Sequence, residues 1–227
     1  TSQLRGQNMA IKNANDGISM AQTAEGALQE SSNILQRMRE LGVQARNDSN
    51  TSTDREALDK EFQAMASELT RIANSTNLNG TILLNGSAGG ATGSVAIQVG
   101  SGTTGDDTIT LELGATAMDA AGLGLVTGTA LTDAATSGDA IDLIDTALDT
   151  INALRADLGA TQNRLTSTIS NLQNINENVS AALGRVQDTD FAAETAQMTK
   201  QQTLQQASTA VLAQANQLPS AVLKLLQ

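Results

Sequence analysis

Residues 144–186 read IDTALDTINALRADLGATQNRLTSTISNLQNINENVSAALGRV, and an aliphatic side chain stands at every seventh position. This row consists of Ile144, Ile151, Leu158, Leu165, Leu172, Val179 and Val186. A second row spaced by seven lies beside it and consists of Ala147, Leu154, Thr161, Thr168, Ile175 and Ala182. Two adjacent rows of this kind form the heptad seam of a coiled coil. The pattern predicts one helix over residues 139–186, about 70 Å long, with Asp139 as its N-cap.

The first 74 residues predict two further helices with matching seams. One runs to about Asn47, and its apolar face consists of Ile11, Ile18, Leu28, Leu35 and Leu41. The polar stretch NDSNTSTDRE (residues 47–56) ends it, and Thr53-x-x-Glu56 has the spacing of a capping box that begins the next helix. That helix carries apolar residues spaced by three and four, namely Leu58, Phe62, Met65, Leu69 and Ile72. The fold class is therefore mainly α, an elongated antiparallel coiled-coil or helix-bundle rod.

Asn15-Asp16-Gly17 is a turn signal inside the first of these helices. The apolar spacing continues on both sides of it, so the helix is expected to pass through. Two interpretations of Gly17 stay open: it allows close backbone approach to a neighbouring helix, or it marks a local bend with no role.

The region from about residue 75 to 138 is rich in Gly, Thr, Ser and Ala. SVAIQVG (94–100) and DTITLELG (107–114) alternate as strands do, and SGTTGD (101–106) between them reads as a hairpin loop. We expect a small β-hairpin and loop insert at residues 81–138, which follows the N-terminal core helices (1–80).

The last residues predict a separate amphipathic helix. QDTDF (187–191) interrupts the seam near Gly184, which divides the C-terminal core helix (139–187) from a terminal helix (188–227). An apolar stripe follows this terminal helix and consists of Phe191, Met198, Leu204, Val211, Leu218, Val222 and Leu225. No segment of this sequence remains to cover the stripe, so it calls for another chain or a missing segment.

Composition excludes several classes of protein. The chain has no His and no Cys, so a Ser-His-Asp triad and a zinc site of the usual type are absent. The net charge is −11, which disfavours nucleic acid as a partner, and no apolar run reaches the length of a membrane span. Asp139, Asp142, Asp145 and Asp149 are spaced three or four apart, but acids in the first turns of a helix are what its dipole favours. We expect no enzymatic activity and no cofactor.

Three stretches resemble bacterial flagellin. They are NANDGISMAQTAEGALQESSNILQRMRELGVQARNDSNT (13–51), LNGTILLNG (78–86) and the C-terminal stretch that begins LGATQNRLTSTISNLQ and runs over residues 158–227. The resemblance implies a structural subunit that polymerises with copies of itself into the flagellar filament and serves motility. It also implies a secreted, extracellular protein whose further partners are an export chaperone and the cap and junction proteins. The family's N-terminal helix would precede Thr1, and the central variable region is short.

The same resemblance implies a recognition surface for the host Toll-like receptor that senses flagellin. The motif LQRMRELGVQ (35–44) matches the family's epitope, and Gln36, Arg37, Leu41 and the later Glu61 occupy its positions. Met38 and Gly42 stand where the family often has Val and Ala. The alternative is that these charged residues are solvated and serve subunit packing.

Two other functions remain open for this sequence. One is a cell-surface protein that uses the flagellin scaffold to bind a ligand or glycan, and the other is a hook–filament junction protein. The intact segments NANDGIS (13–19) and QANQLPSAVLKLLQ (214–227) favour the filament subunit.

Overall fold

The structure is a computed structural model that describes residues 2–114, 116–125 and 129–225, without the side chains of residues 91, 188–190 and 216–225. By its internal contacts the chain divides into an N-terminal unit (residues 1–174) and a C-terminal unit (residues 175–227). The fourfold division expected from the sequence stays a prediction.

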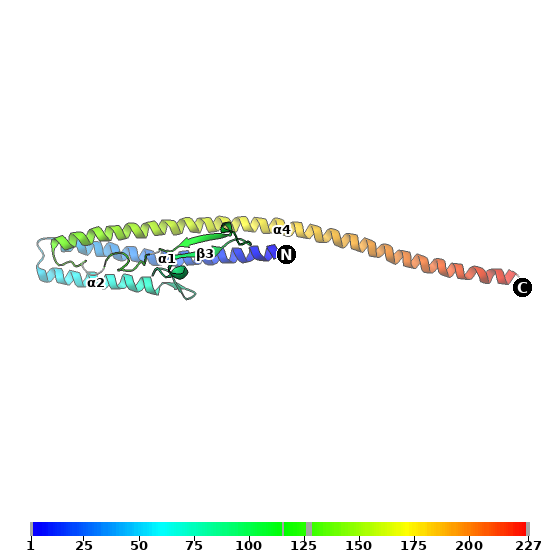
Figure 1. Cartoon of the computed structure of the whole chain (residues 1–227), viewed down its shortest axis with the longest axis horizontal. Coiled ribbons are helices and arrows are strands. Elements are labelled where there is room, and N and C mark those ends of the chain that lie inside the picture. Colours follow the sequence, from blue (N-terminus) through cyan, green and yellow to red (C-terminus); the bar gives the residue numbers. More distant parts are fainter. Residues whose placement is uncertain (1, 115, 126–128, 226–227) are drawn as a thin grey trace. The chain divides into compact units, whose positions relative to one another are not determined.

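Helix α1 (Ser2–Ala45) and helix α2 (Ser52–Ser75) lie side by side and run in opposite directions (Figure 1). Both were predicted, but the N-cap of α2 is Thr51 and not Thr53. The Thr51 hydroxyl accepts the Asp54 N–H (3.3 Å), and the Asp54 carboxylate accepts the Thr51 N–H (3.0 Å). The capping box therefore uses an Asp at the third helical position, two residues earlier than expected. The Thr51 hydroxyl also donates to the Asp54 carboxylate (2.7 Å), and this hydrogen bond, followed by that from the Thr51 N–H, holds the pKa of Asp54 below its usual value.

Arg55 fixes the turn between these two helices. Its side chain is mostly buried and donates from Nε to the Ala45 carbonyl (2.9 Å) and from Nη2 to the Asn47 carbonyl (3.2 Å). The carbonyls at the end of a helix lack intrahelical partners, and Arg55 supplies one for α1.

Helix α4 (Ala134–Leu225) begins five residues before the predicted start. Asp133, not Asp139, accepts the first free N–H groups, those of Ala135 (2.9 Å) and Thr136 (2.8 Å). Asp139 is instead an interior residue of the helix. Gly138, which precedes the expected N-cap, also lies inside the helix and does not mark its beginning.

The segment between α2 and α4 contains two antiparallel hairpins. Strands β1 (Asn77–Leu78) and β2 (Thr81–Ile82) meet at Asn79-Gly80, where both residues have positive φ (51° and 81°). This is the conformation that an Asn-Gly hairpin turn requires; no hairpin was expected at these residues. Strands β3 (Ser94–Gln98) and β4 (Thr108–Glu112) form the predicted hairpin, with the short helices α3 (Ala88–Ala91) before it and η1 (Gly105–Asp107) in its loop.

This insert shares one hydrophobic core with the helices. Its buried residues, among them Leu84, Ile97, Leu111 and Leu125, belong to the same cluster as Leu28, Phe62 and Ile151. Residues 118–125 and 129–131 run along α2 and are held there by polar contacts. Ala120 N–H donates to the Thr70 hydroxyl (3.4 Å), Gln63 to the Thr129 carbonyl (3.2 Å), and Leu131 N–H to the Asp59 carboxylate (2.9 Å).

The heptad row of α4 is buried over the N-terminal unit only. Ile144, Ile151, Leu158, Leu165 and Leu172 lie in the core, whereas Val179 is half-buried and Val186 is 63% exposed. The C-terminal unit consists of one helix, and its described residues offer no second element that could cover Val186. Val186 is therefore not a core residue of this fold.

Gly17 allows close packing, as the first of the two interpretations held. α1 passes through Asn15-Asp16-Gly17 as a helix, and a Cβ on Gly17 would lie 3.0 Å from Ile97 Cγ1 and 3.3 Å from Leu165 Cδ1. The hairpin and α4 therefore meet α1 at this point. Gly42 has the same role near the C-terminal end of α1, where a Cβ would lie 3.0 Å from Ile141 Cγ1 of α4.

Candidate assembly and recognition surfaces

The C-terminal unit carries an uncovered apolar stripe. The helix backbone continues without a break through residues 187–191, where the seam was expected to be interrupted. What changes there is the pattern: the row spaced by seven passes from Val186 to Ala193 and Lys200, and a new row begins at Leu204. Such a shift moves the apolar row to another side of the helix, because successive positions are about 100° apart around the axis. It needs no break in the backbone.

The side chains of this stripe are exposed to solvent. Phe191 is 75% and Leu204 57% exposed, and the other exposed members are Met198, Val211 and Leu212. Leu212 accompanies the stripe in the sequence, since it stands fourteen residues after Met198, on the same face. The side chains of Leu218, Val222 and Leu225 lie outside the described residues.

The rest of this helix surface is polar but nearly uncharged. Thr195, Thr199 and Thr203 donate their hydroxyl hydrogens to the carbonyls four residues earlier, at 2.6–2.8 Å. Those hydroxyls are satisfied within the helix and leave the Gln side chains as the free hydrogen-bonding groups. A surface of this kind can contact copies of itself without charge repulsion.

A second surface lies on α1 and α2 in the N-terminal unit. Arg37 donates from Nη1 to Glu40 (2.9 Å) and from Nη2 to Glu61 of α2 (3.0 Å), and all three side chains are exposed. The hydrogen bond to Glu40, followed by that to Glu61, raises the pKa of the Arg37 guanidinium. Gln36 is exposed next to it.

Leu41 does not belong to this surface. It is fully buried in the core, together with Leu35 and Met38. The spacing that made Leu41 part of the apolar face of α1 turns it inward, so the carried-over contact role fails for this residue in the free chain. Met38 and Gly42, the two departures from the family's motif, are also buried and leave the exposed chemistry unchanged.

A salt bridge and an amide contact join α1 and α4. Arg39 Nε donates to Asp145 Oδ1 (2.7 Å) and its Nη2 to Oδ2 (3.3 Å), while Gln162 Nε2 donates to Glu25 (2.9 Å). The two-pronged contact with Arg39 holds the pKa of Asp145 below its usual value. Asp145 was one of four acids weighed as a catalytic or cation-binding set, and its carboxylate is occupied by Arg39.

The lowered pKa of Asp145 predicts how the variant Arg39→Ala depends on pH. An acid whose folded-state pKa is depressed stabilises the fold above its unfolded pKa, and this stabilisation is lost as the pH falls through the folded value. We therefore expect Arg39→Ala to be less stable than the parent at pH 7 and equally stable near pH 2. Urea unfolding at both pH values measures this, and an equal loss at both would contradict it. Because both side chains are exposed, high salt should shrink the difference.

The described residues hold no cluster of three or more acidic side chains placed to bind a metal ion. Among them, none of the helices has a stretch both long and apolar enough to cross a bilayer.

A long helical unit that ends in a helix with an uncovered apolar stripe defines a class of protein, the self-assembling structural subunit. The chain belongs within this class to the bacterial flagellin family. Residues 1–89 match the "bacterial flagellin N-terminal helical region" and residues 141–226 the "bacterial flagellin C-terminal helical region". Members of this family are structural proteins that form the extracellular filament of the flagellum and serve motility.

Individual relatives agree with this assignment. The chain is 44% identical to a flagellin of Halalkalibacterium halodurans over 99% of its own length and 80% of the relative's. It is 39% identical to flagellin B of Vibrio anguillarum over all of its length and 85% of the relative's. The crystal structure of Bacillus cereus flagellin superposes with a TM-score of 0.60 at 36% identity, over 76% of this chain and 94% of the other.

Proposed function

We propose that this chain assembles into the flagellar filament by burying the stripe of its C-terminal unit against neighbouring copies. The observation that carries the proposal is the row of large apolar side chains, Phe191 foremost, that no other described residue of the chain covers. Each such side chain contributes about 1.5–3 kcal/mol when it is fully buried. An isolated helix gains little stability from its backbone alone, so the association also stabilises the helix itself.

Seeded growth tests this function directly. The purified protein at its natural length is added to sheared flagellar filaments and examined by electron microscopy. The proposal expects tubes that lengthen from the seeds with time and protein concentration. Seeds of unchanged length in the presence of soluble monomer would contradict it.

The same stripe explains why further partners are expected. A chain that exposes Phe191 and Leu204 before assembly is prone to premature association. We infer that an export chaperone covers this helix during secretion, and that the cap and junction proteins contact it at the two ends of the filament.

Recognition by the host Toll-like receptor is a second proposal, and the exposed Arg37 favours it. A guanidinium on a rigid helix, held by Glu40 and Glu61, presents its remaining donors at a fixed place. Arg is enriched among the residues that dominate binding energy at protein interfaces.

We expect Arg37→Ala to weaken receptor binding by about tenfold or more, the loss typical of a dominant interface residue. Surface plasmon resonance with the receptor ectodomain measures the effect. Arg71→Ala is the matched control, because Arg71 is also exposed and pairs with an acid three residues away (Glu68, 2.6 Å). Equal losses for the two variants would remove the recognition surface from α1.

A further inference from the structure

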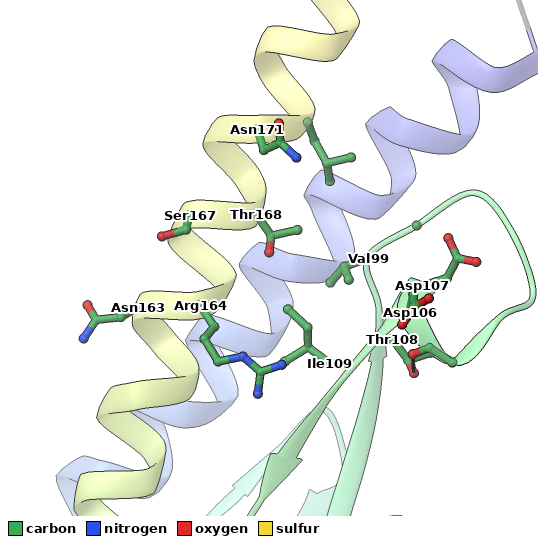
Figure 2. A pocket seen from close by; sticks show the side chains of 13 residues that line it. Val99, Asp106, Asp107, Thr108, Ile109, Asn163, Arg164, Ser167, Thr168 and Asn171 are labelled. Atoms are coloured by element: carbon green, nitrogen blue, oxygen red, sulfur yellow. Dashed lines mark hydrogen bonds between the residues drawn. The ribbon is translucent and has the colours of Figure 1, made fainter.

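A groove of about 790 Å³ lies between the β3–β4 hairpin and α4, within the N-terminal unit (Figure 2). The wall on α4 consists of polar side chains, among them Asn163, Arg164, Ser167 and Asn171. The opposite wall is the first part of β4 and the loop before it, with Thr108 and Asp106. Arg164 extends from α4 toward Ile109 of β4 in Figure 2.

The edge of β4 that is turned away from β3 has unpaired backbone groups. Leu113 N–H donates to the Gly93 carbonyl (2.8 Å) and Val99 N–H to the Asp107 carbonyl (2.7 Å). Hydrogen bonds alternate along an antiparallel pair, so the backbone N–H and C=O groups of Ile109 and Leu111 also point toward β3. Those of Thr110 point away from it. The N–H and C=O of Thr110, the C=O of Thr108 and the N–H of Glu112 have no partner among the described residues.

Two charged groups in the groove are also unpaired. Neither Arg164 nor Asp106 forms an ion pair or side-chain hydrogen bond with any described residue. Asp107 differs, because its carboxylate accepts the N–H groups of Thr104 (3.0 Å) and Gly102 (3.3 Å) and the Thr104 hydroxyl (2.6 Å). The groove therefore offers one free cation on α4 and one free carboxylate at the hairpin loop.

We propose that this groove binds an extended peptide that adds a third strand to the hairpin at the edge of β4. The peptide carries an acidic side chain opposite Arg164 and a basic one opposite Asp106. An extended chain repeats its N–H and C=O groups every two residues, about 6.8 Å, which matches the alternate free groups of Thr108, Thr110 and Glu112. Thr108 lines the groove, and Thr110 and Glu112 continue the same edge of β4 beyond its lining. Main-chain hydrogen bonds supply affinity in this mode of recognition, and the side chains supply specificity. The two opposite charges favour a peptide over a simple anion, which the net charge of −11 would repel.

The test uses the whole chain and a capped heptapeptide of alternating Thr and Val with one Glu and one Lys. Amide chemical shifts of the hairpin report the site, and their titration gives the dissociation constant. We expect saturable shifts at Thr110 and its neighbours. A peptide N-methylated at alternate residues on one edge should bind about tenfold more weakly or worse, because it loses main-chain donors. The N-methylation changes only the peptide, so the same protein is used in both titrations.

Charge recognition is tested separately with Arg164→Gln. This substitution should weaken binding of the Glu- and Lys-containing heptapeptide about threefold to fivefold. It should leave unchanged the affinity of a heptapeptide whose Glu is replaced by Gln. Arg71→Gln, an exposed cation outside the groove, should change neither. Absence of saturable shifts at Thr110, or equal binding of the N-methylated peptide, would overturn the proposal.

Discussion

Phe62→Ala is expected to lower the free energy of unfolding of the N-terminal unit by about 3–5 kcal/mol, the usual cost of emptying a buried phenylalanine site. Phe62 is fully buried on α2 and lies in the cluster that joins the helices to the insert. The chain has only two aromatic residues, so no other large ring can move in to fill the cavity. Urea unfolding followed by circular dichroism measures the loss.

The other aromatic residue provides the control. Phe191→Ala makes the same chemical change at a side chain that is 75% exposed. It should leave the unfolding free energy of the N-terminal unit within about 0.5 kcal/mol of the parent. Equal losses for the two variants would contradict the burial pattern described here.

Replacing Phe191, Leu204 and Val211 together with serine is expected to abolish seeded growth. At about 1.5–3 kcal/mol for each side chain, the loss exceeds the ~4 kcal/mol that corresponds to a thousandfold change in association. Length measurements of seeded filaments by electron microscopy should show no growth at concentrations where the parent elongates. Because these side chains are exposed in the free chain, the stability of the N-terminal unit should not change.

A matched triple on the other side of the same helix separates the stripe from a general effect of serine. Thr199, Thr203 and Gln206 share one face roughly opposite the stripe, and their replacement by serine keeps that side polar. This triple should elongate from seeds. If both triples fail alike, the stripe is not the element that drives assembly.

Much of the fold could be predicted because its helices repeat a strong pattern. Five members of the α4 row, Ile144 to Leu172, are buried as their spacing of seven indicated. The helix ends were less predictable, because several Thr and Asp residues near each end can serve as caps and only the folded geometry selects Thr51 and Asp133. The sequence did not predict that the insert shares the core of the helices. Its composition is dominated by Gly, Ala, Thr and Ser, and only a few residues, such as Leu84 and Leu111, join it to the core.

The candidate surfaces were predictable to different degrees. The stripe of the C-terminal unit followed from sequence, because an amphipathic helix without a partner is visible as a pattern. The position of Leu41 did not, because a motif identifies residues but not which side of the helix another segment covers. The groove beside β4 had no signal at all: Arg164 and Asp106 are 58 positions apart, and only folding brings them to one site.

Hydrogen exchange in the free and the polymerised protein tests the central claim most directly. In the free chain, the amides of residues 191–215 should exchange much faster than those of residues 144–172, because no packed core protects them. In the filament, they should become as protected as the seam of the N-terminal unit. Strong protection of residues 191–215 already in the free chain, or no gain on assembly, would contradict the claim that this stripe is buried by neighbouring copies.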